Sequence, residues 1–177
     1  RSLMSGIFLF NLNKKKMQTQ SIEKSSQVWT KLEREKAISF VKSTFSEQLK
    51  TELKLHHVSA PIAVTAGSGI NDDLNGIEKP IQFNISSLNN TKAEIVQSLA
   101  KWKRLKLGAM HAIPGKGLIT DMKALRPDEV ISPIHSIFVD QWDWEKRISD
   151  KDRNLAYLKS EVKQIYKSIK VSEEFIQ

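Results

Sequence analysis

The chain has 177 residues, a mass of 20.2 kDa and no cysteine; 40% of its residues are hydrophobic and 27% are charged. This length and composition predict one folded domain. The lack of cysteine excludes disulfides, thiolate zinc sites, iron–sulfur clusters and a cysteine nucleophile. The net charge of +8 lies mostly in residues 1–60, which hold 11 Lys and Arg against 5 Asp and Glu, so the charge pattern of the remainder favours no nucleic-acid partner.

Residues 1–30 are predicted to form a poorly structured basic extension. Their run of three lysines at 14–16 has no aromatic residues beside it, which is typical of a solvated flank. The apolar run at 7–10 is much too short to span a bilayer, so we expect no membrane anchor. The lack of cysteine, together with the lack of a secretion signal, favours a cytoplasmic location.

A long amphipathic helix is predicted from residue 31 to about 53, where apolar residues recur mostly at intervals of three and four. Residues 55–64 are predicted to be extended. Pro61 restricts this segment to a sheet edge or an interface, because proline lacks the N–H group that a central strand donates. A turn-rich loop with three glycines follows at 67–76.

The middle of the chain predicts a strand and then a helix. Residues 81–85 alternate as a half-buried strand does. Thr91, with Glu94 three positions later, matches a capping box and predicts a helix that extends to about residue 106.

The last part of the chain predicts a hairpin and a final helix. Residues 118–125 and 134–144 form two predicted strands joined by a long loop, and an apolar stripe predicts a helix over 154–170. This order lacks the regular strand–helix alternation of a parallel sheet. The fold class is therefore predicted to be α+β, with an antiparallel sheet flanked by helices.

Gln141 and Asp143 are the most informative polar pair. Residues two apart on a strand point the same way, so an amide and a carboxylate follow one another on the face that also carries His135, Ile137 and Val139. Such a pair suits recognition of a substrate ammonium group. The alternative is a solvent-facing strand end beside two packing tryptophans.

Cations gather at two further places. Lys101, Lys103, Arg104 and Lys106 lie within a turn and a half of a helix, where they could bind a phosphate or a carboxylate, or could simply form its solvated face. Arg126 comes at the predicted end of a strand and precedes a proline, which suits either a phosphate clamp or an ordinary surface ion pair. The four histidines have no metal-ligand spacing, so no metal site is predicted.

Six stretches form a further pattern in order along residues 31–175. They are ISFVKS at 38–43, VSAPI at 58–62, DLNGIEK at 73–79, SLAKWKR at 98–104, MKALRPDE at 122–129 and VDQWDWE at 139–145. Together they resemble aspartate–ammonia ligase, the ammonia-dependent asparagine synthetase.

This resemblance implies a core similar to class II aminoacyl-tRNA synthetases, and a homodimer. Residues 31–64 would form the dimer-forming first class II motif, and residues 118–144 would form the second. Residues 31–177 would then be the N-terminal portion of a class II synthetase-like catalytic domain, incomplete by itself.

The resemblance also implies the reaction. ATP activates the β-carboxylate of L-aspartate as an adenylate with release of pyrophosphate, and ammonia then displaces AMP to give L-asparagine. Mg²⁺ would bridge the ATP phosphates, without a metal ligand that can be assigned in this chain.

Six residues match the positions of the family's functional residues. Arg126 would bind ATP and neutralise charge on the α-phosphate, and Asp72 would hold ammonium and help to remove a proton. Asp143 would face the substrate ammonium. The other residues implied to bind L-aspartate are Ser98, Lys103 and Gln141.

The sequence departs from the family pattern in two ways. Gln97 stands where the pattern has histidine, and the glycine-rich third class II motif is absent. The chain by itself is therefore expected to be catalytically deficient. A non-catalytic dimerisation or binding module derived from a synthetase fold is the alternative, and a basic RNA-associated protein is a third reading that rests only on the N-terminal charge.

Overall fold

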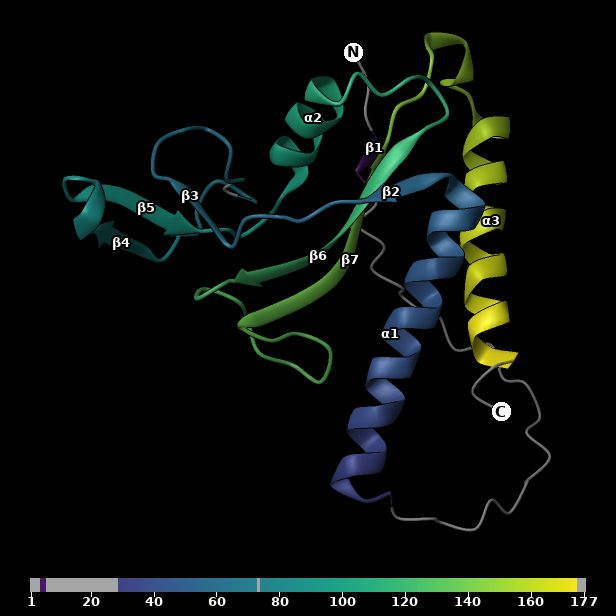
Figure 1. Ribbon diagram of the computed structural model, residues 1–177, viewed down its shortest axis with the longest axis horizontal. Helices are drawn as coiled ribbons and strands as arrows, with labels where there is room; N and C mark the ends of the chain where they lie inside the picture. Colours follow the sequence, from purple (N-terminus) through teal and green to yellow (C-terminus); the bar gives the residue numbers. More distant parts are fainter. Residues whose placement is uncertain (1–3, 6–28, 73, 175–177) are drawn as a thin grey trace.

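The computed structural model describes residues 4–5, 29–72 and 74–174, so the predicted N-terminal extension lies almost entirely outside the described residues. The first long element is helix α1 (Lys31–Leu53), which has the predicted bounds (Figure 1). Thr30 caps it in a capping box with Glu33, in which the Glu33 amide donates to Thr30 Oγ1 at 3.2 Å and the Thr30 amide donates to Glu33 Oε2 at 2.7 Å. The helix ends at Lys54 in the left-handed conformation.

The main sheet has the strand order β1-β7-β6-β2. Its centre is the predicted hairpin, formed by the antiparallel strands β6 (Gly117–Leu125) and β7 (Phe138–Lys146), and β1 (Met4–Ser5) pairs with the last residues of β7. Strand β2 (Leu55–His57), however, pairs with β6 in parallel, so the predicted antiparallel pairing holds for β1, β7 and β6 but not for β2. Parallel neighbours need a long crossover, and the 59 residues from 58 to 116 supply it.

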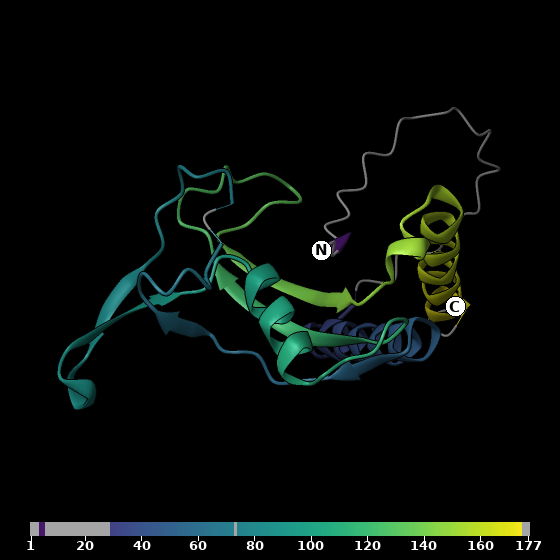
Figure 2. The ribbon, with the colours of Figure 1, turned by 90° about the horizontal axis from the view of Figure 1, so that it is seen from above.

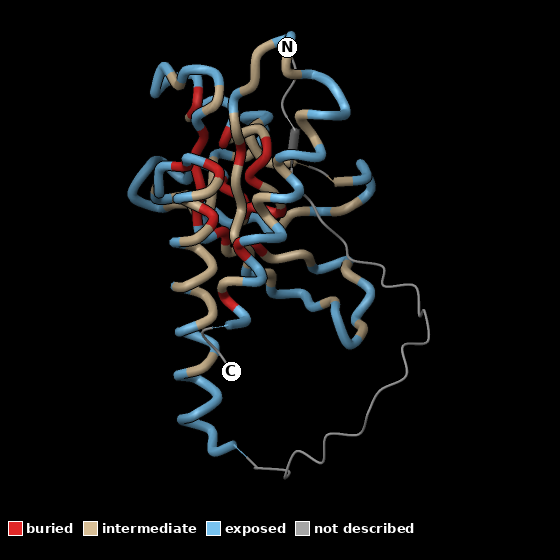
Figure 3. Tube along the Cα trace, turned by 90° about the vertical axis from the view of Figure 1, so that its right-hand side faces the viewer, coloured by how far each residue is buried: buried red, intermediate tan, exposed pale blue. Residues whose placement is uncertain are grey.

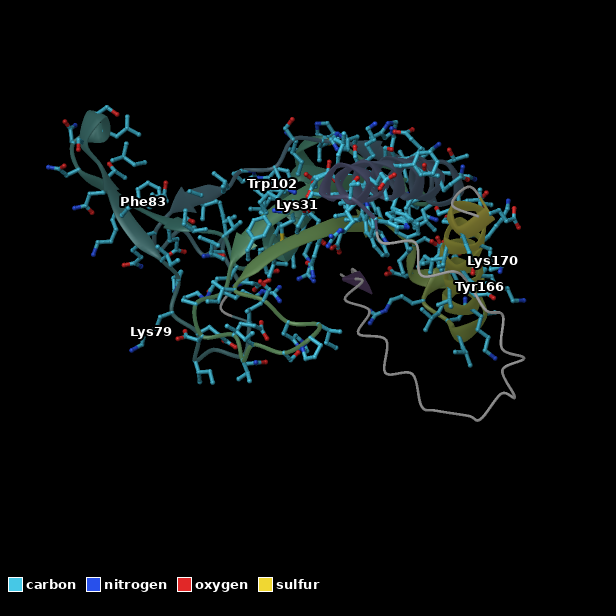
Figure 4. All side chains as sticks on the ribbon, turned by 90° about the horizontal axis from the view of Figure 1, so that it is seen from below. Lys31, Lys79, Phe83, Trp102, Tyr166 and Lys170 are labelled. Carbon is cyan, nitrogen blue, oxygen red and sulfur yellow. The ribbon has the colours of Figure 1, made fainter. Side chains whose placement is uncertain are left out.

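A second, smaller sheet is built within that crossover, in the order β3-β5-β4. It contains β3 (Ala63–Thr65), β4 (Gln82–Ile85) and β5 (Thr91–Ile95), with a short 3₁₀ helix, η1 (Ser86–Leu88), between β4 and β5. Figure 2 shows that the hairpin of β4 and β5 projects away from the rest of the molecule. The strand predicted at 81–85 is present as β4, but Gln82, Phe83 (labelled in Figure 4) and Asn84 are all exposed, so the predicted alternation of buried and exposed side chains was wrong.

Two predictions in this region meet different outcomes. The predicted extended segment is divided around Pro61 into β2 and β3, and both lie at sheet edges, as predicted. The helix predicted from Thr91 was wrong: Thr91 Oγ1 donates to the Leu88 carbonyl at 2.5 Å, and the backbone that follows pairs with strands on both sides. Helix α2 (Ala100–Ala109) begins nine residues later.

Helix α3 (Leu155–Glu174) lies beside α1 and completes the fold (Figure 1). It begins at about the predicted residue, where Asn154 Oδ1 accepts a hydrogen bond from the Tyr157 amide at 2.9 Å. Its predicted apolar face is only partly covered, whereas Ser168 and Ser172 are buried. None of the described helices is long and apolar enough to cross a membrane.

The core consists of two clusters on the main sheet, and buried residues gather around the sheet in Figure 3. The first joins α1 to the sheet, and Trp142 and Trp144 pack against it; its buried residues are Leu49, Leu53, Leu55 and Ile119. The second lies between β6 and the segment that leads into α2; its buried residues are Val96, Leu99, Met122 and Ala124. The structure is thus α+β, with helices against a mostly antiparallel sheet.

Candidate functional site

A cavity of about 970 Å³ lies along the edge of β7. Its walls come from β7, from the segment 126–138, from Phe45 of α1 and from the middle of α3, which includes Tyr166 (labelled in Figure 4). Among the described residues, β1 covers this edge of β7 only at Glu145 and Lys146, so residues 138–144 remain free of a partner strand there. Three predicted site residues line the cavity, namely Arg126, Gln141 and Asp143.

Gln141 and Asp143 lie two residues apart on β7, opposite Met122 and Thr120 of β6. The alternation of strand side chains places both on one face. Trp142 points to the other face, where its ring contacts Phe45 and its Nε1–H donates to the Lys42 carbonyl at 3.1 Å. The tryptophan contacts therefore fix the orientation of the polar pair.

Lys103 of α2 contacts the face of β7 that carries Gln141 and Asp143. It is only 1% exposed; its Nζ donates to Asp143 Oδ1 and, at 3.2 Å, to the Trp144 carbonyl. Sequence spacing could not distinguish Lys103 from its neighbours, but burial does: the side chain of Lys101 is 44% exposed and that of Arg104 is 41% exposed. The buried ammonium group of Lys103 is therefore paired with the carboxylate of Asp143, which the sequence analysis selected.

Glu145 is a second carboxylate beside Lys103, two residues beyond Asp143. It is fully buried, and neither of its carboxylate oxygens has a hydrogen-bond partner among the described residues. Lys103 Nζ lies 3.9 Å from Oε2, and Arg104 Nε lies 3.7 Å from Oε1. Burial raises the pKa of Glu145 to about 7; the charges of Lys103 and Arg104 oppose this rise and that of Asp143 adds to it.

Arg126 follows β6 directly, one residue beyond the strand end at which it was predicted. Its backbone N–H donates to the Ile137 carbonyl at 2.9 Å, and its Nε donates to the Gln97 carbonyl at 3.2 Å. Glu129 Oε2 lies 3.9 Å from Nη1. The guanidinium group is thus held by its Nε and lines the cavity, where it could bind an anionic group.

Asp72 and Ser98 do not line the cavity. Asp72 forms an ion pair with Lys101 at 3.1 Å, and Ser98 Oγ accepts a hydrogen bond from the Ala100 amide at 3.3 Å where α2 begins. Ser98 lies between β5 and α2, next to Leu99 of the second core cluster, whereas Asp72 lies in the loop between β3 and β4 and contacts α2 through Lys101.

A chain of hydrogen bonds nevertheless links the Asp72 loop to Arg126. Asn71 Oδ1 accepts from the Gln97 amide at 2.8 Å, Asn71 Nδ2 donates to the Ile95 carbonyl at 3.1 Å, and the Gln97 carbonyl accepts from Arg126. The side-chain amide of Gln97 is buried and has no hydrogen-bond partner among the described residues. Gln97, which the sequence resemblance marked as an expected departure, thus lies at the centre of this link.

Sequence reasoning missed Asn71 and Glu145. The period of two along 139–145 places Glu145 on the same face as Asp143 and could have drawn attention to it, whereas no sequence signal marks Asn71. Within the part of the chain that the structure describes, no group of three or more His, Asp or Glu residues could hold a metal ion.

Comparisons with known proteins give one consistent result. A sequence model of the family described as aspartate-ammonia ligase matches residues 32–177. A relative named aspartate–ammonia ligase from Clostridium perfringens (strain 13) is 51% identical over 144 residues, which cover 81% of this chain and 43% of the relative. Relatives of the same name from Bacteroides fragilis and Parabacteroides distasonis are 52% and 47% identical over 75% and 80% of this chain. The chain spans less than half the length of these relatives, covering 38% and 41% of the last two.

Proposed function

The chain belongs to the aspartate–ammonia ligase family, and we propose on this basis that it carries part of the site for ATP-dependent amidation of L-aspartate. In the proposed reaction, a β-carboxylate oxygen of L-aspartate attacks the α-phosphorus of ATP and pyrophosphate departs. Ammonia then attacks the β-carbonyl carbon of the adenylate, loses one proton, and AMP departs with the electrons of the broken C–O bond. The product is L-asparagine.

One observation carries the assignment of the aspartate site. The buried Lys103 ammonium donates a hydrogen bond to Asp143. Asp143 and Gln141 both line the cavity. An α-ammonium group of a substrate is chemically equivalent to that of lysine, so Asp143 suits such a group equally well. In the proposal Asp143 binds the ammonium of L-aspartate, Gln141 orients it, and Lys103 pairs with a substrate carboxylate, with Ser98 as a further contact.

Arg126 is proposed to bind the α-phosphate of ATP. Its guanidinium lines the cavity and is positioned through Nε, which leaves its outer N–H groups directed to an anion or to Glu129. A volume of about 970 Å³ is at the upper end of the range of cofactor pockets, and it suits a nucleotide together with an amino acid. A positive charge fixed there stabilises the charge that develops as pyrophosphate leaves.

Asp72 is proposed to hold the incoming ammonium and to accept its proton. It lies on a loop secured through Asn71, and its present partner is an ammonium group, that of Lys101. Mg²⁺ is proposed to enter with the ATP phosphates, because the described residues offer no cluster of ligands for it. The chemistry that Mg²⁺ supplies is neutralisation of phosphate charge.

The assembly and the fold family belong to the same proposal. We propose a class II synthetase-like domain of which residues 31–177 form the N-terminal portion, in a cytoplasmic homodimer. Exposed apolar residues on α1, among them Leu32, Ile38 and Phe40, support a contact with a second copy. Sedimentation should show a dimer that Ile38→Asp dissociates and Lys36→Asp does not; a monomer at every concentration would contradict this part.

Grafting tests the activity. Residues 32–174 would replace the matching part of a full-length relative, and formation of asparagine and AMP from L-aspartate, ATP and ammonia would be measured. We expect an active graft that Arg126→Ala inactivates, whereas Asp143→Asn raises the KM for L-aspartate more than it lowers kcat. Asp121→Asn, which removes an exposed charge from the neighbouring strand, is the matched control. Wild-type kinetics for both site variants would refute the assigned roles.

A further inference from the structure

Lys103 is shared unequally between two carboxylates of β7. Its Nζ donates to Asp143 and to the Trp144 carbonyl. Glu145 Oε2 lies 3.9 Å from the same Nζ, and the Glu145 carboxylate has no hydrogen-bond partner among the described residues. An ammonium group has three N–H donors, so a small rotation of the lysine end brings one of them to Glu145.

The two carboxylates differ in what else can reach them. Asp143 lines the cavity, so a ligand can contact it, whereas Glu145 is fully buried and absent from the cavity wall. A ligand ammonium can therefore compete with Lys103 for Asp143 but not for Glu145. Once displaced, Lys103 needs another anion close by, because an unpaired buried ammonium is costly.

We propose that Glu145 is a positioning residue, which receives the Lys103 ammonium when the ammonium of an amino-acid ligand replaces it on Asp143. In the exchanged state Glu145 accepts one N–H of Lys103, and the other N–H groups of Lys103 can donate to the substrate's carboxylate. This inference rests on the proposed function, because it takes L-aspartate as the ligand.

The electrostatics of Glu145 make the exchange measurable. The charged groups that act on it are Lys103 and Arg104 of α2 and Asp143 of its own strand. Asp143 is paired with an ammonium group before and after the exchange, so the change that acts on Glu145 is the approach of Lys103, whose attraction lowers the pKa of Glu145 from about 7. Glu145 then releases a proton when the ligand binds, and the affinity for L-aspartate rises with pH through about 7.

The first arm of the test needs no ligand. The Glu145 side-chain carboxyl is followed by ¹³C NMR during a pH titration of the 177-residue chain, and Glu145→Gln identifies its resonance. Asp143→Asn removes the carboxylate that holds Lys103, so Lys103 should move to Glu145 and the Glu145 midpoint should fall from about 7, whereas Asp121→Asn should leave it in place. An unchanged midpoint in Asp143→Asn would overturn the proposal.

The second arm adds L-aspartate to the wild-type chain, and it keeps the proposal falsifiable if Asp143→Asn does not fold. Calorimetry should show proton release on binding near pH 7, absent in Glu145→Gln, and NMR should show the same downward shift of the midpoint. Binding without either change would overturn the role of Glu145. Failure of the folded chain to bind L-aspartate, with the first arm positive, would instead count against the proposed aspartate site and leave the coupling of Lys103, Asp143 and Glu145 intact.

Discussion

Replacing Glu145 with glutamine should change how the stability of the protein depends on pH. Glutamine keeps the shape of the side chain but cannot ionise. The pKa of Glu145 lies at about 7 in the folded protein because the side chain is buried, compared with 4.5 for an ordinary glutamate. At about 1.4 kcal/mol per pKa unit, ionising this one group costs the folded state about 3 kcal/mol.

The sign follows from which state binds the proton more tightly. Between pH 4.5 and about 7 the folded protein holds a proton on Glu145 that the unfolded chain has lost, so the wild-type free energy of unfolding falls as pH rises through this window. Glu145→Gln should lack this fall. The variant should therefore gain about 3 kcal/mol relative to the wild type between pH 4.5 and pH 8.

Urea denaturation at a series of pH values measures this difference, and subtracting the two curves cancels the titration of all other groups. Glu47→Gln, at an exposed position of α1 where Lys50 lies 2.7 Å away, is the matched control, and it should not reproduce the gain of about 3 kcal/mol that is expected for Glu145→Gln. Parallel curves for Glu145→Gln and the wild type from pH 4.5 to 8 would refute the reasoning, since Glu145 would then ionise as if it were solvated.

Three further predictions concern single contacts, each measured by urea denaturation. Gly117→Ala places a Cβ 2.7 Å from Leu55 Cδ2 and 2.9 Å from Lys146 Cα, so it should cost about 1–3 kcal/mol, whereas Gly108→Ala has open space and should cost nothing; equal effects would contradict the close strand packing. Trp142→Phe keeps a ring beside Phe45 but removes the hydrogen bond to the Lys42 carbonyl, so it should cost about 1 kcal/mol; an unchanged stability would show that this bond contributes nothing. Thr30→Ala should cost about 1 kcal/mol through loss of the helix cap and Thr30→Ser much less; equal losses would show that the hydroxyl is not the cap.

Local periodicity determined much of the fold. Helix α1 and the β6–β7 hairpin were predictable because their apolar spacing and turn residues act over only a few neighbouring positions. The shared face of Gln141 and Asp143 follows from the strand period of two, which holds in any strand.

Local signals failed where distant segments compete for the same backbone. Thr91 and Glu94 fit a capping box, yet hydrogen bonds to β3 and β4 on both sides hold residues 91–95 as a strand. The parallel pairing of β2 with β6 depends on a crossover of 59 residues, and no short pattern encodes its direction. The apolar stripe of α3 predicted the helix but not that Ser168 and Ser172 would be its buried residues.

The sequence by itself determined which residue types are available to the site: an amide and a carboxylate on one strand, a cationic helix and an arginine at a strand end. Only the tertiary structure decided that Lys103, rather than Lys101 or Arg104, is buried against Asp143, and that the nearby Glu145 carboxylate has no hydrogen-bond partner in the described part of the chain. The physical reason is that burial and charge pairing depend on how α2 packs across β7, and the residues they bring together, 103 and 143, are 40 positions apart in the chain.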